Sequence, residues 1–265
     1  MNFENKICVV TGSTSGIGLG IAEHLLERGA VVYVSGRTAA HMDNAKAKLT
    51  RFGSRAHYEL FDLCESQKAE DYVKAIGNTE GRIDYVFANA GGGTVTPFEQ
   101  ITWEMWSDII GSNLTGVAAI LKGAVPFMKE QRDGHIIITA SIAAFSANPY
   151  QVSYVATKHA AYGIAEALHY ELEEYNIQVK CICPAFVRTP IFTRNGEPEV
   201  AIPPQCISID QALEEIFAGL DEEGVPILVC DEARDFYTNL RTNPSFCDNE
   251  MRNLAKFYSL QLQER

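Results

Sequence analysis

The feature that most constrains the fold is a short apolar run followed at once by a glycine-rich turn and an amphipathic helix. Residues 7–10 read Ile-Cys-Val-Val, which is typical of a strand buried on both faces of a parallel sheet. Residues 11–18, TGSTSGIG, have glycines spaced GxxxGxG, and the helix that follows ends near Gly29. Glycines permit a tight turn, and a helix N-terminus presents N–H groups to an anion such as a pyrophosphate. The pattern therefore predicts a nucleotide-binding strand–turn–helix unit.

Strand-like and helix-like segments alternate along most of the remaining chain. Further strands are expected at residues 31–35, 56–60, 85–88, 136–139, 179–183 and 225–230. Helices are expected at residues 40–51, 66–76, 102–128 and 154–175. This alternation predicts an α/β fold, a doubly wound parallel sheet of about seven strands, with ligands bound at the carboxyl ends of the strands.

Length, charge and cysteine usage narrow the class of protein. The chain has 265 residues and 46% hydrophobic content, without a linker or repeat, so we expect one domain over 1–265. A net charge of −12 argues against a nucleic-acid partner. A strand begins at residue 7, leaving no room for a signal peptide, and no apolar run approaches the ~20 residues that span a bilayer. The seven cysteines are scattered, so we expect reduced thiols, no metal site and a cytoplasmic protein.

Arg37 indicates which dinucleotide is preferred. In folds of this kind an acidic residue after the second strand binds the ribose 2′-OH of NAD, whereas an Arg accommodates the 2′-phosphate of NADP. No Asp or Glu lies between Val31 and His41, and Arg37 is the only Lys or Arg there. The residues favour NADP(H) over NAD(H). The alternative is that Arg37 is an ordinary solvated loop residue.

Tyr154 and Lys158 form the strongest chemical signal. They are four residues apart on the helix expected over 154–175, and so share one face. Unperturbed tyrosine titrates near pH ~10, and a neighbouring positive charge lowers that pKa. Tyr154 is therefore a candidate proton donor to a ketone or a base toward an alcohol. By itself such a pair is also common on solvated helices.

These motifs occur in an order that resembles one family. The landmarks are TGSTSGIG at residues 11–18, Asp62-Leu63, Asn89-Ala90-Gly91, Asn113, Ser141, YVATK at residues 154–158, and PAFVRT at residues 184–189. Over about residues 3–230 the chain resembles a short-chain dehydrogenase/reductase, whose fold is a Rossmann-type sheet.

The resemblance implies an Asn–Ser–Tyr–Lys catalytic set. Tyr154 would be the acid/base, and Ser141 would orient or polarise the carbonyl. Lys158 would lower the pKa of Tyr154 and hold the nicotinamide ribose, and Asn113 would anchor a water that relays protons to Lys158.

The same resemblance places the cofactor along the strand ends. Asp62 and Leu63 would line the adenine site, residues 89–91 the middle of the cofactor, and Val187 and Thr189 the carboxamide. The full set expected to bind NADP(H) is Gly12, Ser13, Thr14, Ser15, Gly16, Ile17, Gly18, Arg37, Thr38, Asp62, Leu63, Asn89, Ala90, Gly91, Tyr154, Lys158, Val187 and Thr189.

Two features depart from the family pattern. Ala185 stands where the family commonly has Gly, so a methyl group is added beside the nicotinamide motif. The chain also continues over residues 231–265 as two amphipathic helical pieces. These pieces would cap the substrate pocket, build an interface, or simply pack on their own subunit. We expect a homodimer or homotetramer.

The substrate is inferred from apolar residues near the expected site. Residues 190–208 occupy the position of the family's substrate lid, and the apolar residues expected near it are Phe145, Tyr150, Phe186, Ile191, Phe192 and Ile202. A bulky apolar alcohol or ketone fits, and the aromatic tail resembles that of bacterial hydroxysteroid dehydrogenases acting on bile acids. The alternatives are a reductase of 3-oxoacyl thioesters or other small ketones, and a non-catalytic nucleotide sensor on the same fold.

Overall fold

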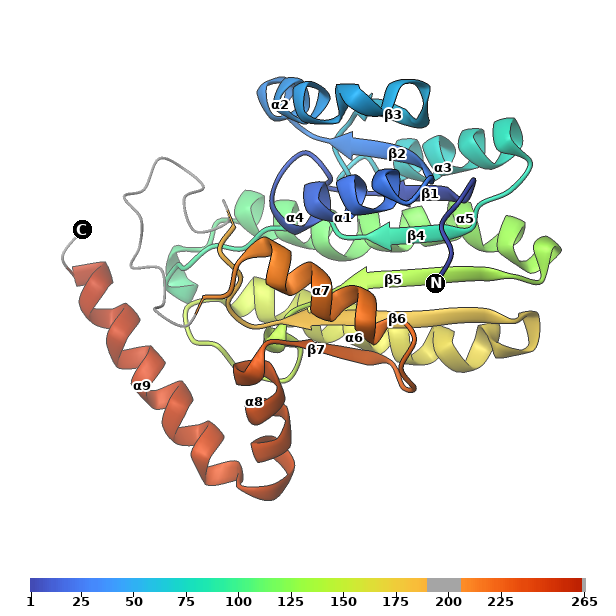
Figure 1. Ribbon diagram of the computed structural model, residues 1–265. Coiled ribbons are helices and arrows are strands. Elements are labelled where there is room, and N and C mark those ends of the chain that lie inside the picture. The colour runs from blue at the N-terminus through green and yellow to red at the C-terminus, as the bar shows by residue number, and fades with distance from the viewer. Residues whose placement is uncertain (190–205, 264–265) are drawn as a thin grey trace.

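A parallel seven-stranded sheet forms the centre of the computed structural model, which describes residues 1–189 and 206–263 (Figure 1). The strand order is β3-β2-β1-β4-β5-β6-β7, and all neighbouring pairs are parallel. The strands are β1 (Ile7–Val10), β2 (Val31–Gly36), β3 (Ala56–Leu60), β4 (Tyr85–Ala88), β5 (Gly134–Thr139), β6 (Ile177–Pro184) and β7 (Pro226–Val229). The predicted doubly wound fold is confirmed.

Helices cover both faces of the sheet. They are α1 (Gly16–Glu27), α2 (Ala39–Leu49), α3 (Ser66–Glu80), α4 (Trp103–Ile110), α5 (Gly116–Gln131), α6 (Val152–Leu172), α7 (Ile209–Gly219), α8 (Asp231–Thr242) and α9 (Pro244–Gln263). Successive residues of β1 point to opposite faces, so Ile7 and Val9 pack with α3, α5 and α6, whereas Cys8 and Val10 pack with α1, α2 and α7. Two apolar layers therefore enclose the sheet.

The strand order reverses between β1 and β4, which are neighbours in the sheet. In open α/β sheets a crevice forms at the carboxyl ends of the strands at such a reversal. The loops that follow β1, β4, β5 and β6 all reach this edge, and they carry most of the predicted site residues.

The helix predicted over residues 102–128 is interrupted, which corrects the sequence analysis. α4 ends at Ile110, a π-helical segment occupies Gly111–Thr115, and α5 begins at Gly116. A π-helical segment inserts a wider turn that re-aims a side chain, and such segments are frequent at functional sites. Here the re-aimed residue is Asn113, which is 1% exposed.

The same stretch bears on membrane insertion. Trp103–Gln131 is long and apolar enough to cross a bilayer by length and composition alone, contrary to the expectation that no run would qualify. Half of its most apolar window is buried inside the protein, where α5 packs against α3 and the sheet. We interpret it as a core helix.

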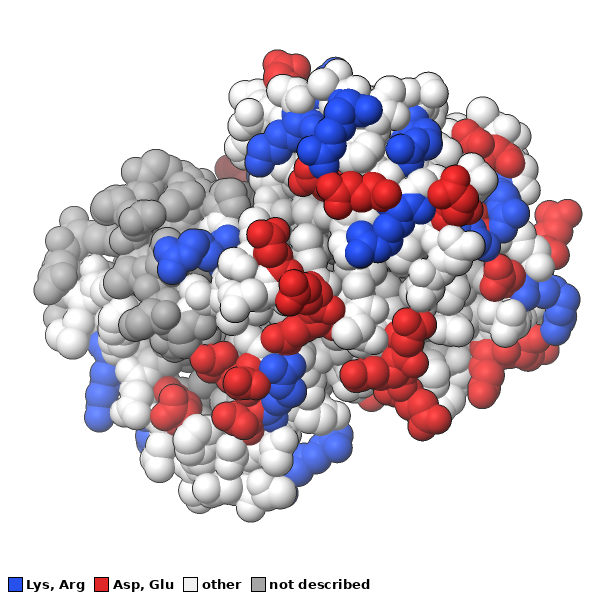
Figure 2. Space-filling view, viewed as in Figure 1, with Lys and Arg blue, Asp and Glu red and all other residues white. Residues whose placement is uncertain are grey.

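The charged surface is mixed. Figure 2 shows acidic and basic side chains interspersed over one face, with basic side chains gathered over α2, whose last turn holds Lys46 and Lys48. The acidic residues that give the chain its net negative charge therefore do not form one continuous patch on this face.

The two helical pieces predicted over 231–265 are α8 and α9 (Figure 1). α8 follows β7 directly and packs beside it and against the short turn Ile142–Ala144, whereas α9 returns along α8. Tyr237 of α8 packs edge-on against Phe145, with ring centroids 4.7 Å apart. α8 thus packs on its own subunit, next to the segment that follows β5.

Close packing of α3 on α5 depends on a glycine. A Cβ at Gly123 would lie 2.8 Å from the carbonyl oxygen of Glu70 and 2.8 Å from Cβ of Val73, closer than real contacts allow. In contrast, Gly163 of α6 is exposed and has open space around the position of a Cβ within the described chain.

We predict opposite effects of alanine at these two glycines. Gly123→Ala should destabilise the fold by about 1–3 kcal/mol because α3 and α5 must separate, lowering Tm by roughly 2–10 °C. Gly163→Ala should stabilise it by about 0.5–1 kcal/mol because alanine favours an exposed helix. Thermal unfolding monitored by circular dichroism measures both. Equal shifts in the two variants would contradict the packing argument.

Candidate functional site

Tyr154 and Lys158 lie on the first turns of α6 and share one face, as predicted. Nζ of Lys158 is 5.5 Å from the ring centroid of Tyr154. Lys158 is 4% exposed, and its Nζ donates a hydrogen bond of 2.8 Å to the carbonyl oxygen of Thr139 at the end of β5. The ammonium is thus fixed by the sheet, and it contacts the ring of Tyr154 rather than its oxygen.

Ser141 follows β5 and faces the phenol of Tyr154. It begins the turn Ile142–Ala144, where its Oγ accepts a hydrogen bond from the backbone N–H of Ala143 at 3.2 Å. The same hydroxyl lies 3.3 Å from the carbonyl oxygen of Pro184, to which it donates. The Ser141 hydroxyl also interacts with the phenol of Tyr154 and lowers its pKa. Two hydroxyl groups are thus held together at the carboxyl edge of the sheet.

Asn113 holds the loop after β4 against α6. Its Nδ2 donates to the carbonyl oxygen of Gly92 at 2.8 Å and to Oγ1 of Thr157 at 3.1 Å. Its Oδ1 accepts from the N–H of Gly92 at 3.0 Å and from the hydroxyl of Ser112 at 3.1 Å. This network satisfies a buried amide that would otherwise be costly.

The groups of Asn113 and Lys158 converge on Gly91. A Cβ there would lie 3.2 Å from Oδ1 of Asn113 and 3.3 Å from Nζ of Lys158. At Gly93 a Cβ would lie 2.8 Å from the ring of Tyr154. Glycines therefore let this loop lie directly against the side chains of Asn113, Lys158 and Tyr154.

Burial shifts the two titratable groups in opposite directions. Burial raises the pKa of Tyr154 above its ordinary value, and an interaction with Ser141 partly offsets this rise. Burial lowers the pKa of Lys158 to about 8. Lys158 is not among the causes of the shift in the pKa of Tyr154 in the ligand-free chain, where Nζ of Lys158 donates to Thr139, so its predicted effect on that pKa stays a prediction.

The glycine-rich turn after β1 is held by close packing and by hydrogen bonds to neighbouring strands. Gly12 has φ +61°, and a Cβ there would lie 2.6 Å from Cα of Ala90. The side chain of Ser13 is buried and hydrogen-bonds to the backbone of Val10 and Ser35. Ser13 therefore stabilises the turn with its side chain, and its backbone N–H also donates to the carbonyl oxygen of Ser35 at 3.0 Å.

The N-terminus of α1 is suited to an anion. Ser15 is the N-cap residue but its side chain makes no capping hydrogen bond within the described chain, and the first turn holds no acidic residue. The helix dipole and the N–H groups of this turn favour negative charge here. The other residues predicted in this turn are Thr14, Gly16, Ile17 and Gly18, of which Thr14 and Gly18 are buried.

Asn89 joins the turn to the centre of the sheet. Its Nδ2 donates to the carbonyl oxygen of Thr11 at 3.2 Å, and its Oδ1 accepts from the hydroxyl of Thr139 at 3.2 Å. Sequence reasoning missed both threonines as parts of the site. The available signal was that each is the polar residue at the carboxyl end of a buried strand, where ligands bind in such sheets.

At the adenosine end, Arg37 contacts two carboxylates. Its Nη1 lies 3.1 Å from Oδ1 of Asp108 and 3.8 Å from Oδ2 of Asp62. Sγ of Cys64 lies 3.7 Å from Oδ1 of Asp108. We name these four residues the Arg37 cluster. Asp62, Cys64 and Asp108 also have ligand atoms within 4.8 Å of one another, but the guanidinium already neutralises part of their charge, so we interpret the group as an ion-pair cluster rather than a metal site.

The remaining residues predicted to bind the cofactor are Thr38, Leu63, Val187 and Thr189. Thr38 is exposed at the N-terminus of α2, Leu63 is 8% exposed, and Val187 is 4% exposed and pairs with Ile207 in a parallel bridge. Thr189 is the last residue described before 190. The predicted lid over 190–208, with Ile191, Phe192 and Ile202, lies outside the described residues except for its last three positions.

Aromatic side chains connect the segment between β5 and α6 with the C-terminal helices α8 and α9. Tyr150 has φ +61°, which is strained for a tyrosine, and its carbonyl oxygen accepts from the N–H of Thr96 at 2.8 Å. Its ring lies edge-on to that of Tyr258 from α9, with centroids 6.3 Å apart. Phe145, predicted near the substrate, packs between Tyr162 and Tyr237 with centroids 4.7 Å from each. Phe145 is thus engaged in packing α8 onto α6.

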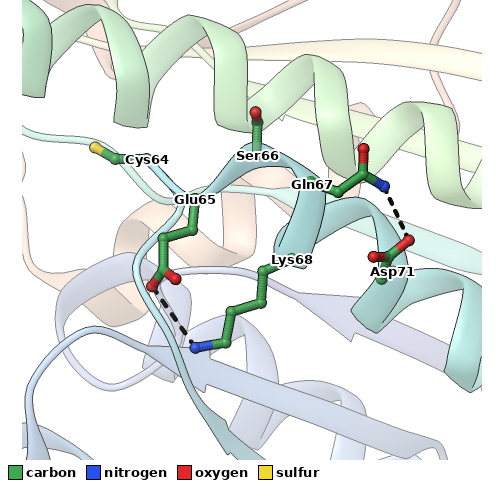
Figure 3. A pocket seen from close by; sticks show the side chains of 6 residues that line it. All are labelled: Cys64, Glu65, Ser66, Gln67, Lys68 and Asp71. Atoms are coloured by element: carbon green, nitrogen blue, oxygen red, sulfur yellow. Dashed lines mark hydrogen bonds and ion pairs between the residues drawn. The ribbon is translucent and has the colours of Figure 1, made fainter.

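A separate hollow opens at the start of α3 (Figure 3). Lys68 pairs with Glu65 at 3.6 Å and Gln67 donates to Asp71 at 3.0 Å. Its lining residues are Cys64, Glu65, Ser66, Gln67, Lys68 and Asp71. Since these polar groups pair with one another and the lining includes no residue predicted at the site, we assign the hollow no ligand.

The chemistry of the strand ends fits a nicotinamide dinucleotide. The glycine turn and the start of α1 suit a pyrophosphate, and Gly91 and Gly93 let the loop after β4 lie close to Lys158 and Tyr154. These two regions lie at the carboxyl ends of β1 and β4, which are neighbouring strands, as the halves of a dinucleotide require.

Comparison with known proteins agrees with this geometry. The model of the short chain dehydrogenase family matches residues 6–199. Dehydrogenase/reductase SDR family member 4 of Oryctolagus cuniculus is 34% identical, and the match covers 88% of this chain and 90% of that protein. The D-beta-hydroxybutyrate dehydrogenase of Cupriavidus necator is 34% identical, with 80% and 81% covered.

The fold also has a solved counterpart. A short chain dehydrogenase from Burkholderia cenocepacia J2315, solved in complex with NADP, superposes with a TM-score of 0.80 over 95% of this chain and 99% of that one. Its sequence identity is 24%, so this likeness concerns the fold. The matches in sequence and fold together show that the chain belongs to the short-chain dehydrogenase family.

Proposed function

We propose that this protein is an NADP(H)-dependent oxidoreductase that interconverts a ketone and a secondary alcohol. The observation that carries the proposal is that Ser141, Tyr154 and Lys158 come together at the carboxyl edge of the sheet, with Lys158 one helical turn beyond Tyr154 on α6. The interaction with Ser141 lowers the pKa of the Tyr154 phenol, so the two hydroxyl groups act on each other. The family assignment supports the same class of reaction.

The chain's own groups account for proton transfer. The cofactor, when bound, supplies or accepts a hydride at the nicotinamide. Tyr154 donates its phenolic proton to the carbonyl oxygen during reduction, and it accepts that proton from the alcohol during oxidation. The hydroxyl of Ser141 hydrogen-bonds to the same oxygen, which becomes more negative as reduction proceeds, so this bond stabilises the transition state more than the ground state.

Lys158 and Asn113 assist Tyr154 in proton transfer. The ammonium of Lys158 stabilises the phenolate that forms when Tyr154 has given up its proton, and it binds the nicotinamide ribose. Asn113 fixes the Gly92 loop and α6 relative to each other through hydrogen bonds to both. We propose that Asn113, which these bonds hold beside Lys158, also anchors a water that returns protons to Lys158.

NADP(H) is the proposed cofactor because Arg37 follows β2 at the adenosine end. A guanidinium binds a phosphate through paired, charge-assisted hydrogen bonds. No acidic residue lies between Val31 and His41 to bind the ribose 2′-OH of NAD instead. Asp62 and Leu63, at the end of the neighbouring strand, are placed to border the adenine.

The proposed substrate is bulky and apolar, such as a hydroxysteroid of the bile-acid class. Support comes from the tail, whose Tyr258 lies beside Tyr150 at the edge of the site. The similarity to a D-beta-hydroxybutyrate dehydrogenase favours a second candidate, a small hydroxy acid or its ketone. A 3-oxoacyl thioester substrate and a non-catalytic role in nucleotide sensing have less support. A cytoplasmic location and a homodimer or homotetramer stay predictions.

The first test is NADPH consumption with a multi-keto bile acid, followed by absorbance. We expect rapid consumption, and product analysis then identifies the carbon that is reduced. No consumption by folded, NADPH-bound protein would reject the steroid. Acetoacetate and a 3-oxoacyl thioester would then be assayed in the same way, and failure with every ketone would favour the nucleotide sensor.

Tyr154→Phe should abolish turnover while the cofactor still binds. Loss of the proton donor should lower kcat by at least about a hundredfold, because general acid catalysis contributes that much or more. The dissociation constant of NADPH, measured by fluorescence titration, should change by less than about threefold, since the phenyl ring stays in place. Tyr162→Phe, two turns along the same helix, is the control and should retain turnover. More than a tenth of wild-type activity in Tyr154→Phe would reject the assigned role.

The pH dependence should follow the shifted pKa of Lys158, about 8. Ketone reduction consumes the phenolic proton, so its kcat/KM should be constant below about pH 8 and fall as Lys158 loses its charge above it. Alcohol oxidation uses the phenolate that the Lys158 ammonium stabilises, so its kcat/KM should also fall as that charge is lost. Initial rates in both directions from pH 5 to 10 measure this. A fall in reduction centred near pH ~6.5 would instead indicate a histidine.

A further inference from the structure

The Arg37 cluster lies where the two possible cofactors differ. Arg37 follows β2, Asp62 follows β3, and Asp108 is in the last turn of α4. β2 and β3 are neighbours in the sheet, and the adenosine ribose of a dinucleotide is expected at this end of it. NADP and NAD differ only by the 2′-phosphate on that ribose, so any charge here discriminates between them.

The guanidinium of Arg37 is already engaged. Asp108 is its shorter contact, with Oδ1 3.1 Å from Nη1, and Asp62 shares the same nitrogen at 3.8 Å. Two carboxylates face one guanidinium, so the local charge is negative. A 2′-phosphate needs the donors of Arg37, and Asp108 both occupies one of them and repels the phosphate. A 2′-OH, in contrast, is neutral and meets no such repulsion.

Asp108 is held in this position by its neighbours. Its backbone carbonyl oxygen accepts from the hydroxyl of Ser112 at 2.8 Å, and Sγ of Cys64 lies 3.6 Å from the same oxygen. The backbone N–H of Cys64 donates to Oδ1 of Asp62 at 2.9 Å. A Cβ at Gly111 would lie 2.8 Å from Sγ of Cys64, so glycine permits this close packing of the Asp62–Cys64 loop on α4. The backbone segments that carry Asp62 and Asp108 are therefore held together in the ligand-free chain.

We propose that Asp108 is a cofactor-specificity residue that weakens NADP(H) binding by competing with the 2′-phosphate for Arg37. This inference rests on the proposed use of Arg37 for that phosphate. The side chains of Arg37 and Asp108 are each 49% exposed, so solvent screens their interaction. We therefore expect an effect of about threefold to tenfold on affinity rather than several orders of magnitude.

The test is fluorescence titration of NADPH and of NADH into the full-length protein at low, fixed ionic strength, where surface charges are least screened. Asp108→Asn removes the charge and keeps the shape. Glu104→Gln is the matched control, because it removes the same charge from an exposed position one turn earlier on α4. Arg37→Ala and the double variant Arg37→Ala/Asp108→Asn complete a cycle that isolates the interaction between the two residues.

We expect Asp108→Asn to tighten NADPH binding about threefold to tenfold and to leave NADH within about twofold. Glu104→Gln should leave both within about twofold, and Asp108→Asn should tighten NADPH binding by less than about twofold in the Arg37→Ala background, where only its direct repulsion of the phosphate is left. An unchanged or weaker NADPH affinity in Asp108→Asn overturns the inference. Equal tightening in Glu104→Gln, or in the Arg37→Ala background, also overturns it, since long-range charge would then be the cause.

The same series separates this inference from the proposed cofactor. If Arg37→Ala weakens NADPH binding while Asp108→Asn changes nothing, the competition fails and the NADP(H) assignment stands. If Arg37→Ala binds NADPH as tightly as the wild type, both fail. The variants change exposed side chains, and circular dichroism with thermal unfolding checks that each one is folded.

Discussion

The site depends on one set of partly buried hydrogen bonds, those that hold the ends of β1, β4 and β5 together. The amide of Asn89 bonds to Thr11 at the end of β1 and to Thr139 at the end of β5. Thr139 in turn accepts from Lys158 through its carbonyl oxygen. Because these bonds link three strand ends and α6, they fix the spacing of the glycine turn and the catalytic candidates. The cofactor and proton-transfer regions are therefore parts of one rigid edge.

Much of this arrangement could be predicted from the sequence, because it follows from local patterns. Buried parallel strands are continuous apolar runs, and all seven were found with boundaries within two residues. Tyr154 and Lys158 share a face because helical geometry requires it. What the sequence did not reveal is nonlocal or subtle. The π-helical segment around Asn113 looks like ordinary helix in composition, and the bonds that Thr139 makes link elements far apart in the chain.

The charges at the adenosine end show the same limit. Local sequence around Arg37 contains no acidic residue, which favours a phosphate site. The fold nevertheless brings Asp62 and Asp108 to it from two other elements, 25 and 71 positions further along the chain. The net charge of a binding site thus depends on all the elements that the fold brings to that edge of the sheet. A sequence motif shows only the charges that are close to it in the chain.

The pKa values of the catalytic pair illustrate how burial acts on both partners. Charge on either group is penalised by desolvation, so the phenol keeps its proton more firmly while the ammonium gives its proton up more easily. In the ligand-free chain Lys158 therefore deprotonates before Tyr154 does, and the phenol is kept as a proton donor at neutral pH. A dinucleotide carries negative charge, and its binding would favour the charged form of Lys158. The ammonium would then be retained where the phenolate forms, so binding and proton transfer are coupled through one buried lysine.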